Sequence, residues 1–259
     1  MKYALGVEYS GTAYCGWQRQ PHCDSVQQHL EAALGFVADH PVDLVCAGRT
    51  DSGVHAIEQV AHFTTSAERS ERAWMLGANC RLPRDIRIKW VLPVSDEFHA
   101  RYSARSRAYR YIILNAEVPS AIFHDRTSWE FRSLDHELMH DCAQMFIGEH
   151  DFSSFRAVGC QSKSASRCVH EVSVTRRGQL LYLDIRANAF LYHMVRNLAG
   201  TLIAVGKGER DKAWCSEVFQ ARNRDLAEVT APAAGLYFLQ AFYEKQFKLP
   251  NVTQKPVLF

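Results

Sequence analysis

Apolar residues occupy every second position in several stretches of the chain, as they do in a β-strand with one buried face. The first such stretch contains Tyr3, Leu5 and Val7. Residues 170–187 show the same pattern around Gly178, which predicts a hairpin that turns near this glycine. By the same criterion we expect further strands at residues 42–45, 59–65, 86–92, 108–114 and 235–243.

Between these strands the apolar residues recur every three or four positions, as they do on one face of a helix. Ser25 and Gln28 have the spacing of a capping box, Leu30 and Leu34 lie on the apolar stripe behind them, and Pro41 ends the pattern. We expect the other helices at residues 68–79, 134–147, 190–206 and 212–221.

The order of these elements indicates an α+β fold of two similar halves whose antiparallel sheets align side by side. Strand, helix, strand, strand, helix and strand follow one another up to residue 93, and a related order begins at residue 108. We therefore expect an N-terminal half at residues 1–104, a C-terminal half at 105–247 and a tail at 248–259.

Composition narrows the class of protein. The 259 residues are 47% hydrophobic and 22% charged, which is typical of soluble globular proteins, and no run of 18 apolar residues indicates a membrane span. The N-terminus turns polar too early for a signal peptide. The eight cysteines include no C-x-x-C pair, so we expect reduced thiols, no zinc site and a cytoplasmic location.

The net charge is only +2, but the charges are unevenly distributed. Residues 81–110 contain eight lysines and arginines against three acidic residues, and the run RYSARSRAYRY mixes arginine with tyrosine and has no acid. Such a run is usually a solvated basic strand edge. Arginine beside tyrosine also suits a surface that neutralises phosphates and stacks on bases, so nucleic acid is a candidate partner.

One loop carries an unusual charged pair. The run CAGRTDSGVHA, residues 46–56, places Arg49 and Asp51 two positions apart between two expected strands. Turn chemistry alone accounts for the glycines, the serine and the aspartate, and the pair is equally explained as a turn stabilised by its own side chains. Turn chemistry does not call for Arg49.

Arg196 and Tyr109 are the other candidates for chemistry. Arg196 lies in a strongly apolar helix, where burying an unpaired charge costs on the order of several kcal/mol, so either an acidic group meets it or its side chain reaches the surface. Tyr109 and Tyr111 share one face of a strand and are either core aromatics or a base-stacking platform. No common zinc spacing is matched by the histidines at positions 55, 62, 99 and 193.

Six blocks of the chain, in order, resemble the TruA-type tRNA pseudouridine synthases. CAGRTDSGVHA is similar to the family signature G-R-T-D-x-G-V-H. The resemblance extends from about residue 3 to about residue 243. The other blocks are GVEYSGTAYCGWQRQ, FHARYSARSRAYRY, DFSSFRAV followed by CQSKSASR, ANAFLYHMVRN and AGLYFLQA.

The resemblance implies an isomerase without cofactor or metal that acts on uridines at positions 38, 39 and 40, in the anticodon arm of tRNA. Such an enzyme cleaves the N1–C1′ glycosidic bond, turns the bound uracil and rejoins it through C5. The family is homodimeric. It has one continuous antiparallel sheet with helices on one face and an active-site cleft between the halves, and we expect the same here.

The resemblance assigns a role to each matching residue. Asp51 is the essential group, which either attacks C1′ or removes a proton from the sugar. Arg196 pairs with this aspartate, and Arg49 is implicated in base flipping. Tyr109 packs on the target base and Leu236 forms an apolar wall of the pocket. RNA contacts are implied at Arg69, Phe98, His99, Ala100, Arg101, Tyr102, Gly159, Cys160, Gln161, Ser162 and Lys163.

One departure and two rivals accompany this interpretation. Ser52 stands where alanine is more usual, and its hydroxyl is a possible donor to the neighbouring carboxylate. A catalytically silent RNA-binding protein on the same scaffold has no need for Asp51 or Arg196, and both are present. An RNA N-glycosidase needs an activated water and a second acid or base, which the loop lacks.

Overall fold

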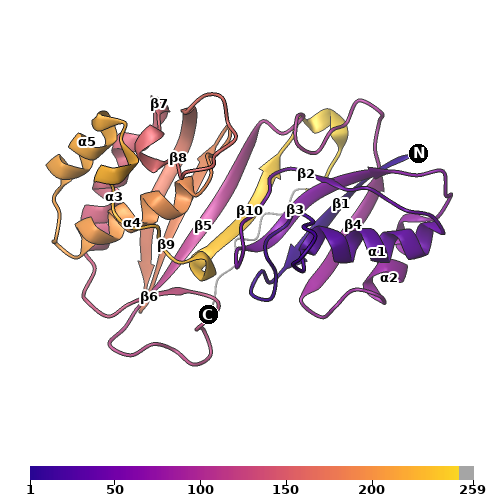
Figure 1. Cartoon of the computed structure of the whole chain (residues 1–259), viewed down its shortest axis with the longest axis horizontal. Coiled ribbons are helices and arrows are strands. Elements are labelled where there is room, and N and C mark those ends of the chain that lie inside the picture. The colour runs from indigo at the N-terminus through magenta and orange to yellow at the C-terminus, as the bar shows by residue number, and fades with distance from the viewer. Residues whose placement is uncertain (251–259) are drawn as a thin grey trace. The chain divides into compact units, whose positions relative to one another are not determined.

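The computed structural model describes residues 1–250, which form two compact units. Unit 1 comprises residues 1–107 together with 237–250, and unit 2 comprises residues 108–236. Ten strands and five α-helices are found in the described part of the chain, so the predicted mixture of helices and sheet is confirmed (Figure 1). Most of the expected tail, residues 251–259, lies outside the described residues.

The strands of unit 1 follow the order β4-β1-β3-β10, with a short β2 beside β3. β1 pairs antiparallel with β3 and with β4, but β10 runs parallel to β3, which differs from the antiparallel pairing that we expected. A parallel pair needs a long connection, and here unit 2 intervenes between the two strands along the chain. The bounds are β1 Lys2–Tyr9, β2 Val45–Cys46, β3 His55–Thr64, β4 Ile86–Pro93 and β10 Leu236–Phe242.

Two helices of unit 1, α1 (Val26–Ala38) and α2 (Glu71–Asn79), lie against its strands (Figure 1). The Ser25 hydroxyl accepts the N–H of Gln28, as the capping box predicts. α2 starts later than expected because Ser70 caps it. Its Trp74 is fully buried, with the ring 5.1 Å from that of Phe63 on β3, and this aromatic contact anchors α2 to the sheet.

Unit 2 contains the order β5-β9-β8-β7, with β6 parallel to β5. β8 and β9 form the predicted hairpin, and Gly178 between them has φ 56°, a left-handed conformation that favours glycine. The short β6 and β7 were not expected. The bounds are β5 Ser106–Asn115, β6 Ser128–Glu130, β7 Gly148–Asp151, β8 Ser166–Arg177 and β9 Leu180–Ala187.

Three helices complete unit 2: α3 (His136–Ala143), α4 (Met194–Gly206) and α5 (Lys212–Ala221). α4 ends at the predicted glycine and α5 has the predicted bounds. α3 is shorter than predicted because the chain tightens into a 3₁₀ turn at Gln144–Phe146. This turn places Phe146 in an aromatic cluster with rings from α5 and the following loop, at centroid distances of 5.1–6.4 Å; the other members are Phe152, Phe155 and Phe219.

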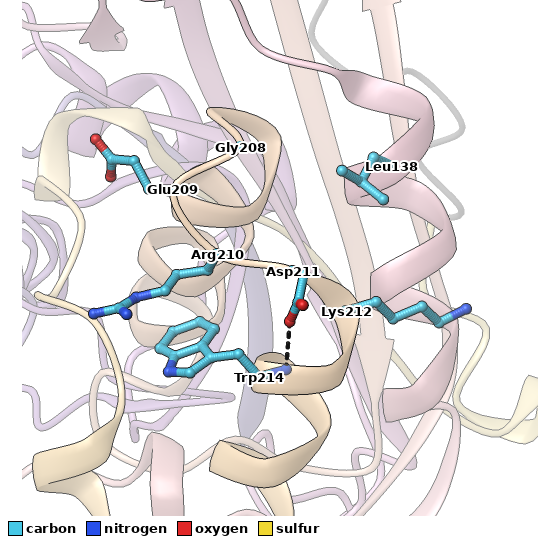
Figure 2. Close-up of a pocket in the computed structure, with 7 residues that line it drawn as sticks. All are labelled: Leu138, Gly208, Glu209, Arg210, Asp211, Lys212 and Trp214. Carbon is cyan, nitrogen blue, oxygen red and sulfur yellow. Dashed lines mark hydrogen bonds between the residues drawn. The ribbon is translucent and has the colours of Figure 1, made fainter.

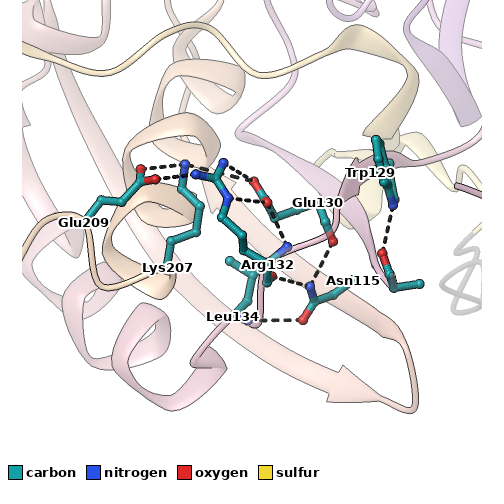
Figure 3. A network of polar contacts seen from close by, with 8 residues as sticks. Asn115, Trp129, Glu130, Arg132, Leu134, Lys207 and Glu209 are labelled. Atoms are coloured by element: carbon teal, nitrogen blue, oxygen red, sulfur yellow. Dashed lines mark hydrogen bonds and ion pairs between the residues drawn. The ribbon is translucent and has the colours of Figure 1, made fainter. Parts of the chain in front are cut away.

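A polar network holds the unexpected strand β6 beside the end of α4 (Figure 3). Arg132 donates from Nε to Glu130 Oε1 at 2.9 Å and also pairs with Glu209. Lys207 Nζ lies 2.7 Å from a carboxylate oxygen of Glu209, and Asn115 Nδ2 donates to the Glu130 carbonyl at 2.9 Å. A three-residue strand has few ladder bonds, and these side-chain contacts add to its pairing with β5.

Two cysteines are brought together in a way that the sequence did not predict. The Cα atoms of Cys15 and Cys23 lie 6.0 Å apart, a separation that a disulfide can span, and the other six cysteines are free. The two meet because the loop before α1 folds back on itself, with the N–H of Cys15 donating to the Asp24 carbonyl at 2.9 Å. A separation of eight residues carries no such signal in the sequence.

Candidate functional site

The signature loop, residues 46–56, is held on one side by the first strand and the loop that follows it. Tyr9 Oη lies 2.7 Å from Thr50 Oγ1, and the N–H of Trp17 donates to the Thr50 carbonyl at 3.0 Å. Gly16 has φ 95°, and a Cβ atom there would lie only 2.5 Å from the same carbonyl. Only glycine allows this close approach, so the backbone before Asp51 rests on a fixed support.

The other side of the loop is held by β3. Gln59 donates from Nε2 to the Gly48 carbonyl at 2.6 Å and accepts the Gly48 N–H at 3.4 Å. Within the loop the N–H of Val54 donates to the Asp51 carbonyl at 3.1 Å, and Gly53 takes the left-handed φ of 77°. The loop is therefore a fixed turn that directs the Asp51 side chain.

Asp51 and Arg49 place their charges at the accessible side of this turn. Asp51 is half-buried and Arg49 is exposed. Burial raises the pKa of the Tyr9 phenol, and the nearby Asp51 carboxylate adds to that rise. Burial also raises the pKa of Cys46 to about 12, against the opposing effect of the Arg49 charge. Tyr9 is therefore a neutral phenol beside the loop at physiological pH.

From the sequence, the Ser52 hydroxyl was a possible donor to the Asp51 carboxylate, but in the structure it donates elsewhere. Its hydroxyl donates to the Tyr14 carbonyl at 3.2 Å, and the N–H of Gly53 reaches the same carbonyl at 3.4 Å. Ser52 thus helps to attach the signature loop to the loop before α1.

Arg196, in the first turn of α4, is half-buried and held by two contacts within unit 2. Its Nε donates to the Ala231 carbonyl at 2.7 Å, and its Nη1 lies 3.2 Å from His193 Nε2. Burial lowers the pKa of His193 to about 4, helped by the charges of Arg196 and Arg224, so the imidazole is neutral and accepts from the guanidinium. Sequence reasoning considered His193 only as a metal ligand and missed this orienting role.

The two tyrosines of β5 have different surroundings. Tyr111 is fully buried and donates from its hydroxyl to the Pro232 carbonyl at 2.8 Å, so it is a core residue. Tyr109 is 8% exposed and meets the ring of Phe190 edge to face at 4.9 Å. Leu236 is buried and follows Gly235, where a Cβ atom would lie 2.8 Å from the Tyr111 ring.

These predicted site residues divide between the units. Arg49 and Asp51 belong to unit 1, whereas Tyr109, Arg196 and Leu236 belong to unit 2. The structure brings Arg49 and Asp51 together in one turn. The pairing of Asp51 with Arg196 joins residues of different units and stays a prediction.

The first predicted RNA segment, Phe98–Tyr102, lies in unit 1. Phe98 and Ala100 are fully buried, so their side chains are withdrawn from any partner. Arg101 and Tyr102 are exposed, and the guanidinium of Arg101 lies 5.7 Å from the centroid of the Tyr102 ring. Arg69, also predicted to contact RNA, is exposed as well.

The second predicted RNA segment, residues 159–163, lies in unit 2 and is held by arginines. Arg156 Nη2 donates to the carbonyls of Cys160 and Ser162 at 2.9 and 2.8 Å. Arg167, which is buried, donates to Ser162 Oγ at 2.7 Å. Lys163 is exposed at this loop. Neither anchoring arginine was predicted, because an arginine that binds backbone carbonyls has the same sequence signal as one that binds phosphate.

Comparison with known proteins places the chain in a family. The family model described as tRNA pseudouridine synthase matches residues 6–103 and 142–244. The chain belongs to the tRNA pseudouridine synthase family. It is 55% identical over 256 residues to tRNA pseudouridine synthase A of Hydrogenovibrio crunogenus, covering 99% of this chain and 98% of the relative. The protein of the same name from Glaesserella parasuis is 49% identical over 259 residues, covering 100% and 99%.

A hollow of about 520 Å³ in unit 2 is separate from the residues that the family resemblance singles out (Figure 2). Its lining includes Arg210, whose guanidinium lies 5.0 Å from the Trp214 ring, and Asp211, which caps α5 by accepting the Trp214 N–H at 2.7 Å. Within residues 1–250 no group of three or more His, Cys, Asp or Glu is placed to hold a metal ion. No helix in that range has the length and apolar character to span a membrane.

Proposed function

We propose that this tRNA pseudouridine synthase acts on uridines at positions 38, 39 and 40 in the anticodon arm of tRNA, with Asp51 as the essential catalytic group. The family membership supports the reaction, and the resemblance of the six sequence blocks supports the substrate positions. The observation that carries the assignment of Asp51 is the fixed turn. Tyr9, Gly16 and Gln59 hold its backbone while its carboxylate is left partly accessible.

The reaction is an isomerisation, so the proton lost from C5 is balanced by a proton gained at N1. The N1–C1′ bond breaks, the uracil rotates while it is bound, and a C5–C1′ bond forms; the C5 proton then leaves to solvent and N1 takes up a proton. A single carboxylate suits this series of steps, because the detached base must return to the same sugar and must not be replaced by water. Tyr109 packs on the base and Leu236 limits the pocket on its apolar side.

The remaining residues keep Asp51 ionised or contact the RNA. Arg196, already oriented by His193 and the Ala231 carbonyl, pairs with Asp51 and keeps it ionised. Arg49, exposed beside it, occupies the space that the flipped nucleotide leaves. Contacts from the two RNA segments and Arg69 go mainly to phosphates, since several sequences are accepted. The enzyme acts as a homodimer in the cytoplasm.

The test is release of tritium from C5 of uracil in an unmodified tRNA transcript. Wild type releases tritium, and in Asp51→Asn the rate of release falls by at least about 1000-fold. The reason is that the amide neither attacks C1′ nor takes a proton. Asp43→Asn is the control, since Asp43 is an exposed aspartate of the same unit, and it keeps the wild-type rate.

Two outcomes contradict the proposal. Wild-type rates in Asp51→Asn would remove this residue from the chemistry. Tight tRNA binding by wild type without any tritium release would favour the catalytically silent RNA-binding protein.

A further inference from the structure

The exposed ring of Tyr102 in unit 1 stacks on the imidazole of His99, which in turn packs at a tilt of 59° against the imidazole of His62; these three side chains are called the stack below. The Tyr102 ring lies 4.3 Å from the imidazole of His99 at an interplanar angle of 28°, and that imidazole lies 4.8 Å from the imidazole of His62 on β3. His62 is buried, whereas Tyr102 is 77% exposed. An aromatic ring held in this way presents its outer face to solvent on a rigid support.

The two imidazoles also hold the backbone of the segment. His99 Nδ1 accepts the N–H groups of Arg101 and Tyr102 at 3.2 and 3.1 Å, and His62 Nδ1 accepts the N–H of Ala100 at 3.1 Å. An imidazole nitrogen accepts a hydrogen bond only when it carries no proton. Both rings must therefore be neutral for the segment to keep this conformation.

The rest of the segment is attached to the core and to the signature loop. Phe98 packs at 5.2 Å on the ring of Tyr243, whose hydroxyl donates to the Ala100 carbonyl at 2.7 Å. Arg107 donates from Nη1 to the Ala104 carbonyl at 3.1 Å and from Nη2 to the Ala47 carbonyl at 3.0 Å. The stack therefore rests on the same framework that holds the Asp51 turn.

We infer that Tyr102 is a platform on which an unpaired base of the bound tRNA stacks, and that His99 and His62 are positioning residues that hold this platform only while they are neutral. This inference rests on the proposed function, because it takes tRNA as the ligand. The guanidinium of Arg101, which lies over the ring 5.7 Å from its centroid, favours nucleic acid, since arginine and an aromatic ring together bind a phosphate and its base.

The charged groups around the stack favour the neutral imidazoles. Burial lowers the pKa of His62 to about 4, and the neighbouring His99 and Lys2 lower it further, against a backbone hydrogen bond with Val45. Burial also lowers the pKa of His99, and the charges of Lys2 and Arg101 act in the same direction. Lys2 donates from Nζ to the Phe98 carbonyl at 3.1 Å, so its charge is fixed near both rings.

The sign of the pH effect follows from these directions. A histidine whose pKa is lowered by folding stabilises its surroundings above its ordinary pKa of about 6.5, and the stabilisation is lost as the pH falls through the folded-state value. The stabilisation by His62 is therefore complete above about pH 6.5 and declines as the pH falls towards about 4, and the stabilisation by His99 also declines as the pH falls below about 6.5.

The first experiment measures the dissociation constant of an unmodified tRNA transcript at about pH 7.5, where both imidazoles are neutral. Tyr102→Ala weakens binding about tenfold, as expected for one lost base stack, while Tyr102→Phe, which keeps the ring, stays within about twofold of wild type. Phe36→Ala is the matched control. Phe36 is also an exposed aromatic of unit 1 with an arginine, Arg81, 4.0 Å above its ring, and it leaves affinity unchanged.

The second experiment separates positioning from general stability. His99→Asn puts a non-titrating oxygen near the place of Nδ1, so it binds tRNA at about pH 7.5 within about threefold of wild type. At about pH 5 wild type loses affinity relative to His99→Asn. His99→Phe keeps an aromatic ring against Tyr102 but has no acceptor, and it weakens binding at both pH values. Circular dichroism at each pH confirms that all variants are folded.

Steady-state rates of tritium release distinguish this inference from the proposed function. Tyr102→Ala raises KM and leaves kcat within about twofold, because Tyr102 binds RNA away from the reacting uridine. Wild-type affinity in Tyr102→Ala, or an affinity ratio between wild type and His99→Asn that does not change with pH, overturns the inference while the enzyme still releases tritium. A change in oligomeric mass of Tyr102→Ala with unchanged tRNA affinity also overturns it and assigns the ring to a protein contact.

Discussion

The two predicted RNA segments are built in opposite ways. In the segment of unit 1, backbone N–H groups donate to the imidazoles of His62 and His99. In the segment of unit 2, backbone carbonyls accept from the guanidinium of Arg156. Imidazoles lose their acceptor nitrogen when they are protonated, whereas a guanidinium stays charged at every pH at which the protein is folded.

Because of this difference, we expect tRNA binding by the two segments to depend on different solution conditions. The segment of unit 1 presents an aromatic ring and is expected to respond to pH. The segment of unit 2 presents Lys163, while Arg156 and Arg167 are occupied by the loop itself, and it is expected to respond to salt. Counting basic residues in the sequence does not separate arginines that bind RNA from arginines that hold a loop.

The largest effect in this comparison is expected for Arg156→Met, which keeps an unbranched side chain but removes the Nη2 group that donates to two carbonyls. The loss is at least that of one charge-assisted hydrogen bond, about 1.5 kcal/mol, and so weakens tRNA binding at least about tenfold. The factor is expected to be the same at about pH 7.5 and about pH 5, because the guanidinium that holds the carbonyls stays charged at both pH values. Filter binding at both pH values measures it.

Arg177→Met is the control for that prediction, since Arg177 is an exposed arginine at the end of β8 in the same unit. It binds tRNA as wild type does. If the loss caused by Arg156→Met changed with pH as it does for the His99 variants, the proposed contrast between the two segments would be wrong.

A smaller effect is expected for Lys163→Ala. If this exposed lysine neutralises one phosphate, its removal lowers the slope of log affinity against log salt by about one, with a modest loss of affinity at physiological salt. A salt titration of tRNA binding measures the slope. Lys212→Ala, an exposed lysine of α5, leaves the slope unchanged. An unchanged slope in Lys163→Ala would remove this residue from the RNA surface.

Much of the fold follows from local pattern. The bounds of α5, the hairpin at Gly178 and the cap at Ser25 were predicted because periodicity and turn chemistry act over a few residues. The parallel pairing of β10 with β3 was not predicted, because it joins residues 182 positions apart, such as His55 and Tyr237, and depends on the whole of unit 2 between them. β6 was missed because three residues are too few for a period to show.

The sequence indicated candidate site residues where a motif contains them. It did not indicate the residues that hold those side chains or their backbone in place. Asp51, Arg49 and Arg196 follow from sequence blocks. The acceptor role of His99 and the contact of His193 with Arg196 have no sequence signature, since any histidine can accept from a donor that folding brings to it. Phe98 and Ala100 entered the predicted RNA surface as members of a segment, and burial withdraws their side chains.

We propose that this enzyme isomerises uridines at tRNA positions 38–40, and the most direct test compares two transcripts labelled with tritium at C5 of every uracil. One transcript has uridines at positions 38, 39 and 40; the other has cytidines there, with the stem pairs restored. We expect up to three tritium equivalents to be released from the first transcript and none from the second. Equal release from both transcripts would contradict it.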